Sequence, residues 1–163
     1  MRLRTLLAGL LLAASAAWPQ AASRTKTGPP DPPKPDVPFI IHADTLLETE
    51  IGEAKEETRK DEQWYTIPGA SASIRTPLAG PEFLFLSESI RPDKLQLFKL
   101  DSKGGRREVL VMRKKKPVVR PVVLSVFRVH DKVYRIRVDD SLTAGEYSLS
   151  PDGSNAVFCF GVD

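Results

Sequence analysis

Residues 145–162 read GEYSLSPDGSNAVFCFGV, in which the turn sequence PDGSN at 151–155 separates two apolar runs. Apolar runs on either side of such a turn predict a β-hairpin. In the second run the side chains of one face are all apolar, and those of the other are apolar or small: Phe158, Phe160 and Val162, against Val157, Cys159 and Gly161. Since neither face is polar, we predict a final strand that is covered on both sides.

A second hairpin is predicted where Gly104-Gly105 separates the apolar runs 95–100 and 107–112, because glycine adopts the positive φ of a tight turn readily. A two-residue loop pairs three sets of residues across the hairpin: Leu100 with Val109, Phe98 with Val111, and Asp101 with Glu108. The like charges of the last pair repel each other, which favours a register slip of one or two residues.

A third hairpin is predicted around Asp131-Lys132, between the runs 122–129 and 133–138. Pairing through this turn sets Val129 against Tyr134 and Phe127 against Ile136, and we expect that face to be core. The opposite face carries three arginines: Arg128 against Arg135, with Arg137 nearby.

With further strands at 39–41 and 83–86, about seven short strands separated by turns predict an all-β fold, an antiparallel sandwich formed by residues 39–163 as a single domain. The acidic stretch 44–62 is the exception. Its Glu-rich composition favours a short helix within 45–62, whereas Gly52 argues for the alternative, an exposed extended ribbon.

The segment LTAGEYSL at 142–149, followed by a turn and a closing apolar strand, resembles the last two strands of an immunoglobulin-like β-sandwich. This resemblance implies that Tyr147 is a corner tyrosine whose hydroxyl bonds back to nearby backbone. Antibody-type domains are excluded, because no cysteine follows Tyr147 by two residues. The GEY and FCFGV strands are also similar to those of uncharacterised bacterial exported proteins.

Residues 1–22 have the pattern of a cleavable signal peptide, with Arg2 and Arg4 before an uncharged run from Leu6 to Trp18. That run is too short for a membrane span, and we expect no span in the mature chain. The six prolines of 24–38 then predict a flexible linker over 23–38. The expected location is therefore periplasmic or secreted.

The whole chain carries 24 Lys or Arg and 21 Asp or Glu, a net charge of +3. Removal of residues 1–22 takes away two arginines and leaves a net charge of +1, which gives no case for nucleic-acid binding. Cys159 is the single cysteine, so an intrachain disulfide is excluded and the core must stabilise the domain.

No catalytic, metal or cofactor motif stands out. Two isolated histidines, His42 and His130, do not predict a metal site, which needs three or four converging ligands. No Gly-x-Ser-x-Gly is present, and Cys159 lies within an apolar strand where thiols are usually inert. We therefore expect a protein that is not an enzyme and has no cofactor.

Charge is strongly segregated along the chain. Residues 94–137 hold 14 Lys or Arg and three acids, a net +11, whereas residues 43–62 carry a net −5. Eight cations are candidates for binding an anion or a partner: Arg113, Lys114, Lys115, Lys116, Arg120, Arg128, Arg135 and Arg137. The counter-charge of Arg128, Arg135 and Arg137 is either the chain's own acidic segment 44–62, which we favour, or an external glycan, lipid headgroup or acidic protein.

These features together predict an exported, non-enzymatic binding or interaction module of a bacterial cell envelope. Its partner would be a protein or an anionic envelope component. Two alternatives stay open: a hydrolase that uses surface carboxylates, and a structural accessory subunit of an envelope assembly.

Overall fold

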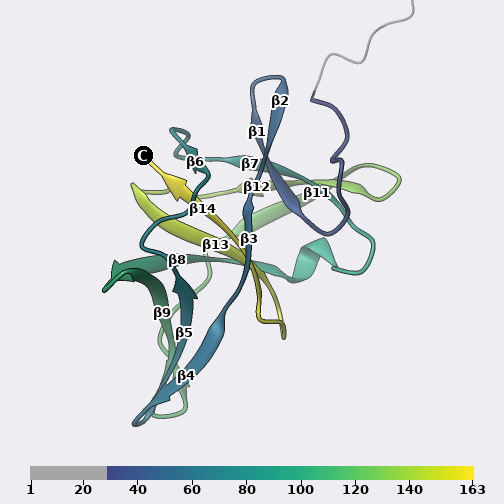
Figure 1. Ribbon diagram of the computed structural model, residues 1–163. Helices are drawn as coiled ribbons and strands as arrows, with labels where there is room; N and C mark the ends of the chain where they lie inside the picture. The colour runs from purple at the N-terminus through teal and green to yellow at the C-terminus, as the bar shows by residue number, and fades with distance from the viewer. Residues whose placement is uncertain (1–28) are drawn as a thin grey trace, which may run out of the picture.

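The computed structural model describes residues 29–163, and strands make up most of this range (Figure 1). The one helical element in the described part is a single 3₁₀ turn, η1 (Pro92–Lys94). The predicted signal peptide at 1–22 lies outside the described residues.

The strands form two sheets. The first has the order β11 (Leu124–His130), β12 (Val133–Val138), β7 (Glu82–Leu86), β1 (Pro38–His42) and β2 (Thr45–Glu48). The second has the order β3 (Glu50–Glu53), β14 (Ala156–Val162), β13 (Gly145–Pro151), β8 (Leu95–Lys103), β9 (Arg106–Arg113), β5 (Glu62–Pro68) and β4 (Lys55–Arg59). Two short strands join the second sheet: β10 (Lys116–Pro117) pairs with β9, and β6 (Arg75–Thr76) runs parallel to β14.

The main core lies between the first sheet and one face of β8, β13 and β14. Phe83 of β7 meets Phe160 of β14 edge to face, with ring centroids 5.3 Å apart, and Tyr147 stacks on the other side of Phe160 at 5.7 Å. Ile40 and Ile136 are fully buried in the same cluster. Two packed, antiparallel sheets confirm the predicted all-β sandwich, although it has more strands than the seven expected.

The other face of the same central strands belongs to a second core. Val157 and Cys159 of β14 pack there with Ala54, Leu100 and Val109, all of them buried. β14 is thus buried on both faces, as its two apolar faces predict.

The second sheet curls around this second core. Its two end strands, β3 and β4, are separated in the chain only by Ala54, whose N–H donates to the Asn155 carbonyl at 2.8 Å. One continuous stretch of chain therefore supplies both ends of the sheet.

Residues 45–62 do not form a helix; the helix prediction was wrong. They form β2, β3, β4 and the start of β5. The Glu-rich composition suits these strands because most of their side chains point to solvent, while Gly52 lies opposite Val157, whose side chain would be only 3.3 Å from a Cβ at position 52. Pairing with β14 and β5 outweighs the weak helix preference of glutamate.

The β8–β9 hairpin keeps the register of its two-residue loop, so the expected slip does not occur. Asp101 lies opposite Glu108 as predicted, and the carboxylate of Glu108 is neutralised by Arg59 at 3.0 Å and Arg106 at 3.3 Å. The predicted pairings of Leu100 with Val109 and of Phe98 with Val111 are wrong, because β8 pairs with β9 only over residues 101–103. Leu100 and Phe98 have partners only across the opposite edge of β8, in β13.

The β11–β12 hairpin differs from its predicted register by one residue. A bulge between Arg128 and His130 sets Val126 opposite Ile136 and Phe127 opposite Arg135. Phe127 and Val129, which we expected in the core, are consequently exposed. Leu124 and Val126 pack against the core in their place.

The predicted linker over 23–38 ends earlier than expected. Pro35 bridges to Leu86, Val37 is buried and Pro38 begins β1. The Asp36 carboxylate accepts hydrogen bonds from the N–H groups of residues 88–90 at 2.9–3.0 Å. These contacts make the second half of the Pro-rich stretch part of the domain.

Tyr147 makes the contact predicted for it. Its hydroxyl donates to the Thr143 carbonyl at 2.7 Å, four residues upstream. The bond fixes the loop that enters β13 to the face of the main core.

Substitution of Phe160 by alanine tests the main core. We expect Phe160→Ala to lower the free energy of unfolding by about 3–5 kcal/mol, because a fully buried ring that contacts two other rings is lost. Phe127→Ala removes the same group from an exposed position and should cost less than about 1 kcal/mol. Equal losses for the two variants in urea unfolding would contradict this assignment of the core.

Candidate functional site

The basic run at 113–116 lies at the end of the molecule formed by β4, β5 and β9 (Figure 1). Arg113 pairs with Glu62, its Nε lying 2.8 Å from Oε1. Lys114 and Lys115 form the turn between β9 and β10 with φ values of 49° and 61°. The Lys114 N–H donates to the Asp61 carbonyl at 2.7 Å, so the β4–β5 and β9–β10 turns lie side by side.

The three arginines of β11 and β12 are a separate group on the first sheet. Arg135 pairs with Glu82 at 3.3 Å, and Arg137 pairs with Asp139 at 3.5 Å while lying over the Phe127 ring. Arg128 donates to the backbone carbonyl of Asp131 at 2.7 Å. The eight candidate cations are thus divided between the two sheets.

The acidic segment 44–62 does not cover these three arginines, so that expectation was wrong. The carboxylates at Glu82 and Asp139 are on β7 and directly after β12. The acidic segment neutralises other cations of the basic region, since Glu50 pairs with Arg107 and Glu62 with Arg113.

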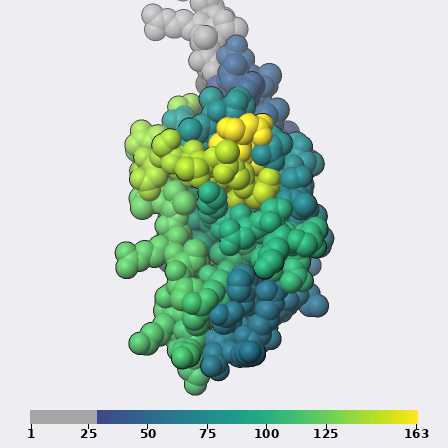
Figure 2. All heavy atoms as spheres, turned by 90° about the vertical axis from the view of Figure 1, so that its left-hand side faces the viewer, coloured from purple at the N-terminus to yellow at the C-terminus, as the bar shows by residue number. Residues whose placement is uncertain are grey.

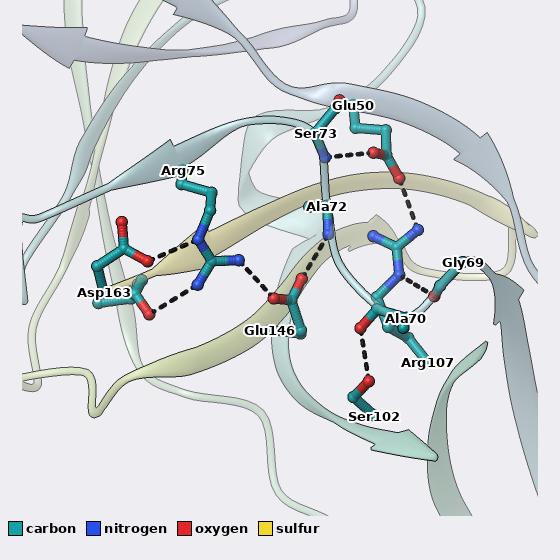
Figure 3. Close-up of polar contacts among 11 residues, drawn as sticks. Glu50, Gly69, Ala70, Ala72, Ser73, Arg75, Ser102, Arg107, Glu146 and Asp163 are labelled. Atoms are coloured by element: carbon teal, nitrogen blue, oxygen red, sulfur yellow. Dashed lines mark hydrogen bonds and ion pairs between the residues drawn. The ribbon is translucent and has the colours of Figure 1, made fainter. Parts of the chain in front are cut away.

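Arg107 is the centre of a buried ionic cluster that sequence reasoning missed (Figure 3). Its side chain is 2% exposed; Nη2 donates to Glu50 Oε1 at 2.6 Å and to the Pro68 carbonyl at 2.8 Å, and Nε donates to the Gly69 carbonyl at 3.0 Å. Burial alone would raise the pKa of Glu50, but the Ser73 N–H and Arg107 outweigh it and hold that pKa below its usual value.

A second carboxylate binds the same loop. Glu146 Oε2 accepts the Ala72 N–H at 2.7 Å, and its Oε1 accepts Arg75 Nη1 at 2.7 Å. Arg75 also donates to Asp163 at 2.6 Å, and its guanidinium lies where a Cβ at position 161 would be, so a larger residue than Gly161 would require Arg75 to move (Figure 3).

The loop 69–74 is therefore fixed by side chains from β3, β9 and β13. It inserts Ala72, which is 4% exposed, into the second core. We assign this ionic cluster to closing one end of the curled sheet, because Glu50, Arg107 and Glu146 each form a hydrogen bond to the backbone of the loop.

The opposite end of the second core is open. A groove with a volume of about 500 Å³ lies on the concave face of the curled sheet. Its apolar wall comes from alternate residues of neighbouring strands: Tyr65 and Ile67 of β5, Phe98 and Leu100 of β8, Val109 and Val111 of β9, with Ala54, Met112 and Val157. Alternation of this kind places one face of each strand inside the groove.

The groove exists because β8 and β9 separate. They pair only over 101–103 and 106–108. On its other edge β8 pairs with β13 over residues 95–100, and on its other edge β9 pairs with β5 from Arg106 to Arg113. The segment 116–122 crosses the gap between them: the Val118 N–H donates to the Val111 carbonyl at 3.0 Å, and the Val122 N–H donates to the Leu97 carbonyl at 2.8 Å. Pro117, Val119 and Pro121 of this segment form the remaining wall.

The polar groups of the groove are mostly uncharged. Amide and hydroxyl side chains come from β5, β8, β13 and the β13–β14 turn: Gln63, Gln96, Ser148, Ser150 and Ser154. The charged residue among the described lining is Asp152 in that same turn, and no lysine or arginine lines the groove.

The residues weighed for catalysis or metal binding lie apart. His130 Nε2 is 2.9 Å from Asp31 on the surface, His42 is exposed at the end of β1, and Cys159 is buried. Within residues 29–163, no three His, Cys, Asp or Glu side chains gather as metal ligands do. Over the same range, no helix has the length and apolar character needed to span a membrane.

Arg107→Met tests the ionic cluster. The free energy of unfolding should fall by about 1–3 kcal/mol, because the partly buried Glu50 carboxylate and two backbone carbonyls lose a donor. Arg120→Met, on the exposed segment 116–122, should change it by no more than about 0.5 kcal/mol. A small effect of Arg107→Met in urea unfolding would show that the loop 69–74 does not depend on this cluster.

The reactivity of Cys159 tests the second core. Burial raises the pKa of its thiol to about 11, so it stays protonated at neutral pH. We expect no reaction with a disulfide reagent at a pH of about 8 in the folded protein, and rapid reaction once denaturant unfolds it. Rapid labelling of the folded protein would mean that this side of β14 is open to solvent.

Comparison of the chain with models of protein families, with curated proteins and with solved structures gives no match in any of the three.

Proposed function

We propose that this protein is a non-enzymatic binding module that takes an elongated, uncharged apolar ligand into the groove of its curled sheet. The observation that carries the proposal is the groove itself, about 500 Å³ of space lined by alternate apolar residues of neighbouring strands. Ligand sites of proteins commonly enclose about 300–1,000 Å³ and combine an apolar wall with a few polar groups.

The partial exposure of the apolar groove walls supports a ligand site. Tyr65, Phe98, Val111 and Val119 are only half-buried although they face the interior of the curl. Removal of apolar surface from water contributes about 25 cal/mol per Å². An apolar ligand that covers these partly exposed side chains would therefore gain binding free energy.

The lining also supports an uncharged ligand. An anion in the groove would meet the Asp152 carboxylate and no lysine or arginine, and burial of an unpaired charge is costly. Gln63, Gln96 and Ser150 instead offer amide and hydroxyl groups to a hydroxyl, ester or amide at one end of the ligand.

We further propose that the protein acts outside the cytoplasm. A signal-peptide pattern at residues 1–22 supports export to a bacterial cell envelope, where apolar molecules need a carrier or a receptor to cross aqueous space. The eight basic residues, divided between two sheets, do not form the walls of the groove.

Binding of the uncharged fluorophore N-phenyl-1-naphthylamine tests the groove. We expect its emission to rise with the protein, with displacement by dodecanol stronger than by dodecanoate. Val119→Trp and Gln96→Trp fill the groove from two walls and should each weaken binding by about tenfold or more.

The matched control is Val118→Trp, which adds the same ring to the neighbouring, exposed position and should leave the affinity within about twofold. Unchanged binding in both groove variants would refute the site. Preferential displacement by dodecanoate would refute the uncharged ligand while leaving the site in place.

A further inference from the structure

The stretch 113–130 has an unusual combination of charge and exposure. No Asp or Glu occurs between Val109 and His130, whereas six cations do: Arg113, Lys114, Lys115, Lys116, Arg120 and Arg128. The chain as a whole is nearly balanced, so this stretch, which we name the 113–130 strip, is its most one-sided region.

Exposed apolar side chains gather in the same strip. Of the six large apolar side chains exposed in the described part of the chain, four belong to it: Val118, Val123, Phe127 and Val129, which are 46–59% exposed. The other two, Ile51 and Leu78, lie on β3 and after β6. Concentration of exposed apolar surface in one region marks an interaction surface.

The cations at the lower part of the strip are not neutralised. Within residues 29–163, no carboxylate forms an ion pair with Lys114, Lys115, Lys116 or Arg120. Lys114 and Lys115 also occupy both positive-φ positions of a turn for which Asn-Gly is favoured. The backbone of the β9–β10 turn is thus strained at two positions that carry lysine side chains.

The segment 116–122 alternates between two sides. Pro117, Val119 and Pro121 line the groove, so the residues between them, Val118 among them, lie on the outer side of the same segment. In Figure 2 the corresponding green part of the surface runs as a column along one side of the molecule, from the tip of β9 upward. The strip, which holds both the unpaired cations and the four exposed apolar side chains, therefore runs along one side of the molecule.

We propose that the 113–130 strip docks on the surface of an anionic lipid membrane. Lysines near such a surface are attracted by its negative potential, and exposed valine and phenylalanine side chains gain by entering the boundary between headgroups and acyl chains. An acidic polysaccharide would engage the lysines but offer nothing to these four apolar side chains. This inference goes beyond the groove and does not depend on it.

The lower end of the strip lies far from the N-terminal end of the described chain. The described chain begins at the end of the molecule where β1 and β2 lie, whereas the turn between β9 and β10 lies beside the β4–β5 turn at the opposite end (Figure 1).

Sedimentation with lipid vesicles tests the proposal. We expect the full chain to bind vesicles with about a quarter of anionic phosphatidylglycerol more tightly than pure phosphatidylcholine, with the difference reduced by salt well above 0.1 M, roughly where the Debye length falls below 10 Å. Every variant carries the same residues 1–28, so differences between variants report on the strip and not on the N-terminal segment.

Two sets of substitutions separate charge from apolar contact. The triple variant K114Q/K115Q/K116Q should weaken binding to anionic vesicles by about tenfold or more, whereas K55Q/K94Q/K103Q removes three exposed lysines elsewhere and should change it by less than about threefold. V118S/V123S should also weaken binding, while I51S/L78S, which removes the two exposed apolar side chains outside the strip, should not.

Each outcome has a clear meaning. Equal effects of a strip variant and its control would overturn the proposal. If V118S/V123S binds vesicles normally and soluble dextran sulfate competes fully, the partner is an anionic polysaccharide and the membrane assignment is wrong. Circular dichroism of each variant shows that it is folded before binding is compared.

Discussion

Burial of β14 on both faces is the constraint on which the rest of the structure depends. One face meets the first sheet through Phe160, and the other meets the inside of the curled sheet through Val157 and Cys159. A strand covered on both sides requires a layer on each, and the chain supplies them by packing one sheet against its neighbour and curling the other back on itself. Both the sandwich and the groove follow from this single requirement.

Local pattern accounts for much of the fold. The alternation of apolar residues in 157–162 and the turn residues at 104–105 and 151–155 predict real strands and turns, because they report contacts within a strand and its nearest partner. The helix in 45–62 failed for the opposite reason. Its glutamates are compatible with either state, and only pairing with the distant β14 decides between them. The bulge at Val129 likewise cannot be recognised from the residue types around it. It shifts the register so that Phe127 lies outside the core.

The groove and its ionic closure could be predicted only in part. Gln63, Tyr65 and Ile67 show the alternation of an inward-facing strand, but nothing in the sequence indicates that residues 95–100 of β8 do not pair with β9 and leave space between the two strands. Arg107 is one of many cations in its region, and its burial depends on Glu50, which is 57 residues away in the chain. Pairings over such distances are set by the completed fold, whereas the Lys114–Lys116 run is visible directly as composition.

The position of the acidic stretch at the ends of the second sheet has a consequence for how the protein behaves at high concentration. End strands of a sheet expose unpaired backbone groups that recruit a second chain into aggregates. Here those strands, β3 and β4, are only four and five residues long, and they carry Glu50, Glu53, Glu56 and Glu57. Two copies that met edge to edge would bring these carboxylates together and repel each other. Glu50 and Glu57 are already paired with Arg107 and Arg59, so the repulsion comes from Glu53 and Glu56. The acidic composition that favours a helix therefore works against edge-to-edge pairing of two copies.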